Sequence, residues 1–86
     1  MTIHTITNTR HGVPYGDSEV SITYVATFDL EEATGVIGAA SVRIETIHHE
    51  SGGKSFPMSP TLQNYWLGLL EDGYDPIRAA AGRLVP

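Results

Sequence analysis

The sequence predicts an α+β domain, with a three-stranded antiparallel β-meander followed by two short C-terminal α-helices packed on one face of the sheet. Apolar residues recur with a period of two in the first half of the chain and with a period of about 3.6 in the second half. Short connections join the period-two segments, as suits antiparallel neighbours. With 86 residues the chain has the length of one domain, so we expect a single domain over residues 1–86.

The central strand is predicted from Glu19 to Leu30, where apolar and polar positions alternate most regularly. The face expected to be buried carries Val20, Ile22, Tyr24, Ala26, Phe28 and Leu30. The opposite face carries Ser21, Thr23, Val25 and Thr27. Because β-branched and aromatic side chains suit a pleated, half-buried surface, this pattern favours a strand over a helix.

A hairpin loop is expected over Glu31–Gly35, with Gly35 at a positive φ, and the next strand from Val36 to His48. The side chains that continue the apolar face are Val36, Ala40, Val42 and Ile44. The opposite, outer face is expected to carry Ile37, Ser41, Arg43, Glu45 and Ile47. The outer face would then be only partly polar.

Small side chains from Gly38 to Ala40 predict a bulge or a close backbone approach in this strand. With Leu30 near Val36, Tyr24 would lie opposite Val42 and Phe28 opposite Gly38, and a slip by one pair is the alternative. An earlier strand is expected from Thr2 to Thr9. The connector from Arg10 to Asp17 is expected to be irregular, because it contains two glycines and a proline. If the first segment does not pair, a hairpin and two helices remain.

Ser59 and Pro60 predict the start of the first helix, since serine caps helices and proline suits the first helical position. Its core-facing stripe is expected to be Leu62, Tyr65, Trp66, Leu69 and Leu70. Gly73 is placed just past the helix end. Asp75 and Pro76 repeat the capping signal, and a second short stripe follows at Ile77, Ala80, Ala81 and Leu84.

Composition excludes several classes of function. Ten acidic and five basic residues give a net charge of −5, which argues against direct nucleic-acid binding and leaves DNA mimicry as a weak alternative. Without cysteine there is no disulfide, thiolate chemistry or cysteine zinc site. The first residues do not resemble a signal peptide and no apolar run is long enough for a bilayer, so we expect a soluble, cytoplasmic protein without membrane contact.

Motifs for phosphate, metal and catalysis are incomplete. Gly53-Lys54-Ser55 resembles the end of a phosphate loop, but His48 stands where that loop needs a glycine, so a surface loop is expected. The adjacent His48 and His49 point to opposite faces of a strand and cannot bind one ion together. A metal site would need Glu50, His4 or His11 to join one of them. We therefore expect no metal and no cofactor.

No pattern in the sequence identifies catalytic residues. The Gly-x-Ser-x-Gly motif is absent, and the carboxylates of Glu31 and Glu32 are expected to be solvated at a hairpin tip. Asp75 has a capping role that accounts for it. We therefore expect a protein that is not an enzyme.

The candidate partner-binding residues are apolar or aromatic side chains outside the expected core. Val25, Ile37 and Ile47 lie on the outer face of the predicted sheet, and Leu67 lies off the stripe of the first helix. Three more are expected in loops, where binding residues often occur: Tyr15, Phe56 and Met58. Trp66 and Tyr65 are expected in the core.

The sequence favours a small protein-interaction module, such as a regulator, inhibitor or accessory protein. Its partner is expected to be another protein, and the apolar outer face slightly favours a homodimer. Two alternatives stay open. One is a structural subunit of a larger assembly, and the other is a small ligand-binding or enzyme subunit that uses His11 or His48.

Overall fold

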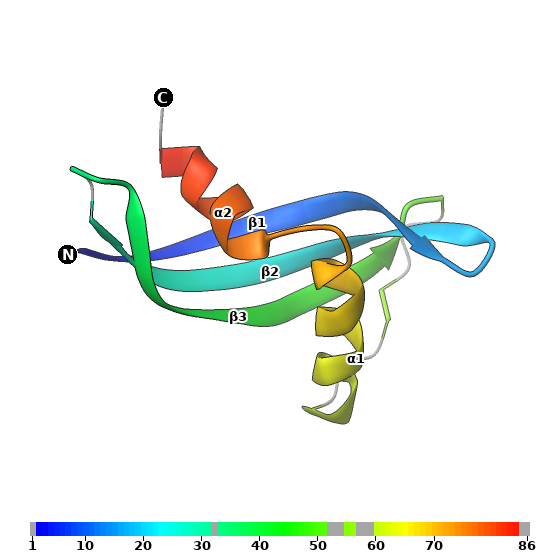
Figure 1. Ribbon diagram of the computed structural model, residues 1–86. Helices are drawn as coiled ribbons and strands as arrows, with labels where there is room; N and C mark the ends of the chain where they lie inside the picture. The colour runs from blue at the N-terminus through cyan, green and yellow to red at the C-terminus, as the bar shows by residue number, and fades with distance from the viewer. Residues whose placement is uncertain (1, 32, 52–54, 57–59, 85–86) are drawn as a thin grey trace.

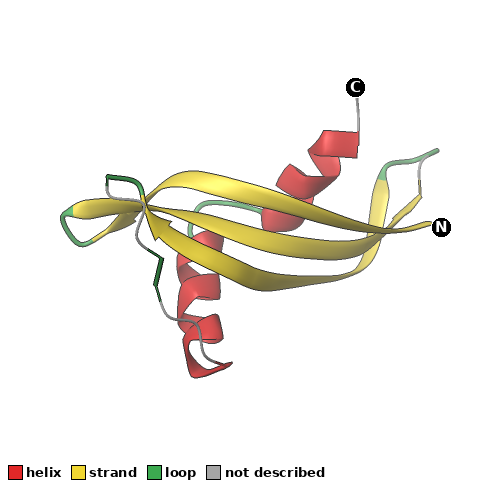
Figure 2. Ribbon diagram, turned by 180° about the vertical axis from the view of Figure 1, so that it is seen from behind, coloured by secondary structure: helices red, strands yellow, loops and turns green. Residues whose placement is uncertain are grey.

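The structure is a computed structural model that describes residues 2–31, 33–51, 55–56 and 60–84. Its antiparallel sheet has the order β1-β2-β3, and both helices lie on one face of it (Figures 1 and 2). The predicted α+β architecture is therefore confirmed. The expected cap Ser59, the residues Gly53 and Lys54, and the candidate Met58 lie outside the described residues. The elements are β1 (Thr2–Tyr15), β2 (Ser18–Glu31), β3 (Val36–His49), α1 (Pro60–Glu71), α2 (Pro76–Ala81) and a final 3-10 turn η1 (Gly82–Leu84).

Strand β1 is longer than the sequence predicts, because it continues through the expected connector to Tyr15. Only Gly16 and Asp17 separate it from β2. The prediction of an irregular connector was wrong because β1 continues through Gly12 and Pro14. Gly12 takes a positive φ of 67° in a bulge, and Pro14 lies on an edge strand, where a residue without an N–H is tolerated.

Strand β3 contains two irregularities that set its register against β2. Tyr24 lies opposite Ile44 and Phe28 opposite Ala40, so the expected pairing of these residues was off by two positions. One register shift falls opposite Asp29, which confirms the bulge predicted around Gly38. The other shift makes Glu45 the extra residue of a second bulge.

The two bulges change which side chains of β3 point to the core. Because a bulge places two residues against one, the alternation of faces shifts by one position there. Ile47 is 1% exposed and belongs to the core, and Ile37 packs against it, so their predicted placement on the outer face was wrong. Val36, predicted to be on the buried face, is 52% exposed.

The core lies between the inner face of β2 and the helices. Alternate β2 side chains from Val20 to Phe28 are buried, together with Trp66 and Leu70 of α1 and Ala80 of α2. On α1 the buried stripe is rotated from the predicted one, because Leu67 packs against the core while Tyr65 is 53% exposed.

Side chains satisfy backbone groups at the ends of both helices. The guanidinium of Arg10 donates to the carbonyls of Leu70 and Asp72 at 2.7 and 3.1 Å, and so caps the C-terminal end of α1. Asp75 caps α2 as predicted, since its carboxylate accepts from the N–H groups of Ile77 and Arg78, both at 3.1 Å. The contacts of Arg10 join the end of α1 to β1. Gly73 follows α1 with φ of 65° and Gly35 precedes β3 with φ of 73°, both as predicted.

Side chains also occupy parts of both sheet edges. The amide of Gln63 donates to the carbonyl of Ile44 at 2.9 Å and accepts from its N–H at 3.1 Å, which is how a neighbouring strand would bind. On the other edge, Arg83 donates to the carbonyl of Thr7 at 3.0 Å. An open strand edge invites pairing with other chains, and these contacts partly close it.

Candidate functional site

The face of the sheet opposite the helices, here called the outer face, has no helix over it (Figure 2). Cross-strand hydroxyl pairs run across it. The hydroxyls of Thr9 and Thr23 lie 3.0 Å apart, and those of Thr5 and Thr27 lie 3.5 Å apart. From strand alternation and register, the hydroxyl-bearing residues of the outer face are Thr5, Thr7, Thr9, Ser21, Thr23, Thr27, Ser41 and Thr46.

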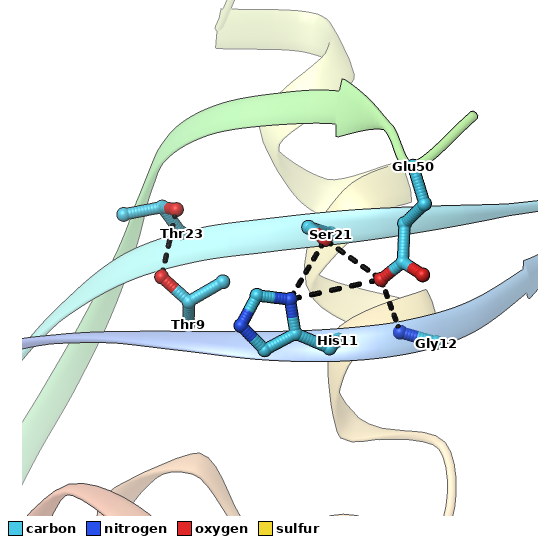
Figure 3. A network of polar contacts seen from close by, with 6 residues as sticks. All are labelled: Thr9, His11, Gly12, Ser21, Thr23 and Glu50. Atoms are coloured by element: carbon cyan, nitrogen blue, oxygen red, sulfur yellow. Dashed lines mark hydrogen bonds and ion pairs between the residues drawn. The ribbon is translucent and has the colours of Figure 1, made fainter. Parts of the chain in front are cut away.

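A polar network lies on this face where β1 bulges, and we call it the bulge network (Figure 3). It consists of His11 and Gly12 of β1, Ser21 of β2, and Glu50 just after β3. The carboxylate of Glu50 accepts from the N–H of Gly12 at 2.6 Å and from the hydroxyl of Ser21 at 2.8 Å. A bulge leaves its extra residue outside the strand ladder, and the carboxylate satisfies the N–H concerned.

His11 completes the bulge network from its exposed side. Its Nδ1 lies 3.0 Å from the hydroxyl of Ser21 and 3.7 Å from the carboxylate of Glu50, and its side chain is 75% exposed. Hydrogen bonds from Gly12 and Ser21, together with the nearby His11, hold the pKa of Glu50 below its usual range. Glu50 is therefore ionised at neutral pH and acts only as an acceptor.

The direction of these hydrogen bonds decides the chemistry that the bulge network can do. Because the hydroxyl of Ser21 donates its hydrogen to ionised Glu50, the serine oxygen is left to accept from Nδ1–H of His11. In a serine nucleophile the histidine is the acceptor of the serine proton. In the bulge network His11 is instead the donor to Ser21. The network therefore links three strands and does not activate Ser21.

The other histidines have separate contacts. His48 lies beside Ser21 in the sheet, and its Nδ1 is 3.1 Å from the hydroxyl of Ser55. His49 stacks on Phe56, with 4.3 Å between ring centroids. In the ranges that the structure describes, no three histidine, aspartate or glutamate side chains come together as a metal ion would require.

Two hollows mark the ends of the outer face. The one beside the bulge network has a volume of about 260 Å³ and is lined by Asp17, Ser18, Glu19, Glu50 and Ser51. Neither His11 nor His48 lines it. The hollow at the opposite end has a volume of about 280 Å³ and is lined by Ile3, Thr27, Phe28, Asp29, Ala39, Ala40 and Ser41.

The structure does not bring the predicted partner-binding residues to one surface. Tyr15 and Phe56 contact the buried Trp66, each at 5.2 Å between ring centroids, and so close one end of the core. Ile37, Ile47 and Leu67 also belong to the core or pack against it. Of the described candidates, only Val25 lies on the outer face, half-buried beside Thr7 and Arg43.

Sequence reasoning singled out His11 and His48 but missed Ser21 and the role of Gly12. The signal that was available was Gly12 itself, because a glycine within a threonine- and isoleucine-rich segment is typical of a bulge. Glu50 was considered only as a partner for a metal. Its actual role depends on the register of all three strands.

In the described ranges, neither helix has the length and apolar character needed to cross a membrane. Comparisons of the chain with protein-family models, with curated proteins and with solved structures give no match. A function for this fold therefore has to be argued from the outer face and its contacts.

Proposed function

We propose that the protein is a small non-enzymatic interaction module that binds a partner protein through its outer face. The observation that carries this proposal is the position of the helices. Both pack on the inner face, and within the described ranges no helix covers the outer face along strands of 14 residues each. Three such strands, at about 3.3 Å per residue and about 4.8 Å between strands, present roughly 650 Å². A typical protein interface buries about 800 Å² per partner, so the area is of the right order.

The composition of the outer face suits a polar interface. Hydroxyls arranged in rows offer both donors and acceptors, and half-buried Val25 adds apolar contact. Interfaces between proteins that also exist separately have about the same polarity as ordinary protein surface. The reversed hydrogen-bond direction in the bulge network supports a binding role over a hydrolytic one.

A different protein fits this face better than a second copy of the chain. The apolar patch that favoured a homodimer is missing, since Ile37 and Ile47 turn to the core. Among the residues that the structure describes, the outer face also carries several carboxylates against one arginine, Arg43, which already pairs with Glu45 at 3.0 Å. Two copies placed face to face would repel each other.

Site-specific photo-crosslinking in the native host tests this proposal. We expect a photo-reactive benzoylphenylalanine in place of Thr46, exposed on the outer face, to cross-link a partner protein. The matched control places the same group at Asn64, exposed on α1. Equal products from both positions, or none from position 46, would contradict binding through the outer face.

A further inference from the structure

The hollow at the far end of the outer face is built around Asp29. In the sheet Asp29 lies between Ile3 of β1, its register partner, and the bulge at Gly38 and Ala39 of β3. Because the bulge residues have small side chains, β3 leaves space beside the carboxylate. The result is the hollow of about 280 Å³ described above.

The walls of this hollow combine an apolar surface with a single charge. Ile3 is 70% exposed, and Ala39 is exposed as well. Asp29 is the charged residue among those that line the hollow, and it is half-buried. Within the described part of the chain its carboxylate has no hydrogen bond or ion pair.

The arginines of the chain are committed elsewhere. Arg10 caps α1 and Arg83 donates to Thr7, while Arg43 pairs with Glu45. The fourth, Arg78, lies 3.7 Å from Asp75 on the other side of the molecule. None of them neutralises Asp29. A second copy of the chain could offer an arginine only by breaking one of these contacts.

We infer that the Asp29 hollow receives a lysine or arginine side chain from the partner protein, an inference that rests on the proposed function. Long cationic side chains lay their alkyl stems along apolar surface and keep the charged group at a polar site. Ile3 and Ala39 supply the apolar surface, and Asp29 supplies the opposite charge. The hollow has a volume of about 280 Å³ and opens to solvent, so a side chain can enter it from outside.

A peptide titration followed by NMR tests this assignment on the free protein. The probe is a blocked alanine pentapeptide with a central arginine, and the control peptide carries norleucine instead. We expect the arginine peptide to shift the amide signals of Asp29, Ala39 and Ser41 more than the norleucine peptide does. Asp29→Asn should weaken this binding about two- to fivefold, the range of one partly exposed ion pair.

Asp17→Asn is the matched control, because it removes a carboxylate from the hollow at the other end of the same face. It should leave the peptide shifts around Asp29 unchanged. The inference is overturned if Asp29→Asn binds the arginine peptide as wild type does, or if both variants weaken binding equally. Preserved signal dispersion in each variant shows that the fold is intact.

Repeating the Thr46 cross-link in the Asp29→Asn background separates this inference from the proposed function. A partner captured by wild type, with a lower yield in the variant, supports both. Capture with an unchanged yield keeps the outer face as the binding surface and overturns the role of Asp29. If wild type captures nothing, the proposed function fails, and the peptide titration decides on the hollow alone. Self-association that Asp29→Asn abolishes would identify a second copy as the occupant and overturn the assignment to another protein.

Discussion

At the scale of single residues, Tyr24 joins the sheet to the C-terminal region. Its ring is fully buried, and its hydroxyl donates to the carbonyl of Pro76 at 3.0 Å. The same hydroxyl accepts from the amide of Asn8 at 2.9 Å and lies 3.1 Å from the hydroxyl of Tyr74. Burial first, and the hydrogen bond with Tyr74 second, raise the pKa of Tyr24 well above its usual value.

Replacing Tyr24 by phenylalanine should therefore destabilise the protein by about 1–3 kcal/mol, because Pro76 and Asn8 lose a buried partner. The measurement is urea denaturation followed by the fluorescence of Trp66, the single tryptophan. Tyr74→Phe is the control, and it should cost less because its hydroxyl makes one of these contacts. An unchanged midpoint for Tyr24→Phe would show that the hydroxyl contacts contribute nothing.

The carboxylate of Glu50 makes stability depend on pH. Its folded pKa lies below the ordinary value of 4.5, so it stabilises the fold above that pH. The stabilisation is lost as the pH falls from 4.5 through the lowered folded pKa. Glu50→Gln should flatten the decrease in denaturation midpoint over this range, whereas Glu71→Gln, at the exposed end of α1, should not. Parallel profiles for wild type and Glu50→Gln would exclude the contribution.

At the scale of elements, both helices depend on contacts beyond their own sequence. Helix α2 has six residues, too few to be stable alone, and is held by its cap and by the burial of Ala80. Helix α1 has 12 residues, and its C-terminal carbonyls are satisfied by Arg10 of β1. Helix formation and docking on the sheet are therefore coupled.

The cap of α2 gives a direct test of this dependence. Asp75→Ala removes the acceptor for two N–H groups and should destabilise the whole protein by about 1 kcal/mol. Asp75→Asn keeps the capping oxygen and should recover most of the loss. Thermal and urea midpoints measure both variants, and equal losses in the two would assign the effect to charge instead of capping.

At the scale of the whole molecule, the sequence predicts the fold class, the extent of β2, and the glycine and aspartate signals at turns and caps. Each of these features follows from the pattern of neighbouring residues in the sequence and needs no knowledge of distant contacts. The faces of β3 could not be predicted, because a bulge at Glu45 arises from pairing with β2 and leaves no local signal. The bulge network was missed for the same reason, since Glu50 reaches Gly12 only when all three strands are in register.

Metal independence is a prediction for the whole molecule. A structural metal contributes directly to the free energy of folding, so its removal lowers the thermal midpoint. We expect incubation with a chelator to leave the midpoint unchanged. A decrease that added zinc reverses would contradict this and direct attention to the histidines.

The extra residue in β3 also bears on how this chain tolerates changes in length. Removing Glu45 would pair Ile44 and Thr46 with consecutive residues of β2 and leave Ile47 on the core face. Removing Ser41 from the regular part of the strand would instead turn Ile44 outward, or break the pairing. Deletions within one strand should thus differ sharply in effect, with the bulge as the position where a codon can be lost while every buried side chain keeps its place.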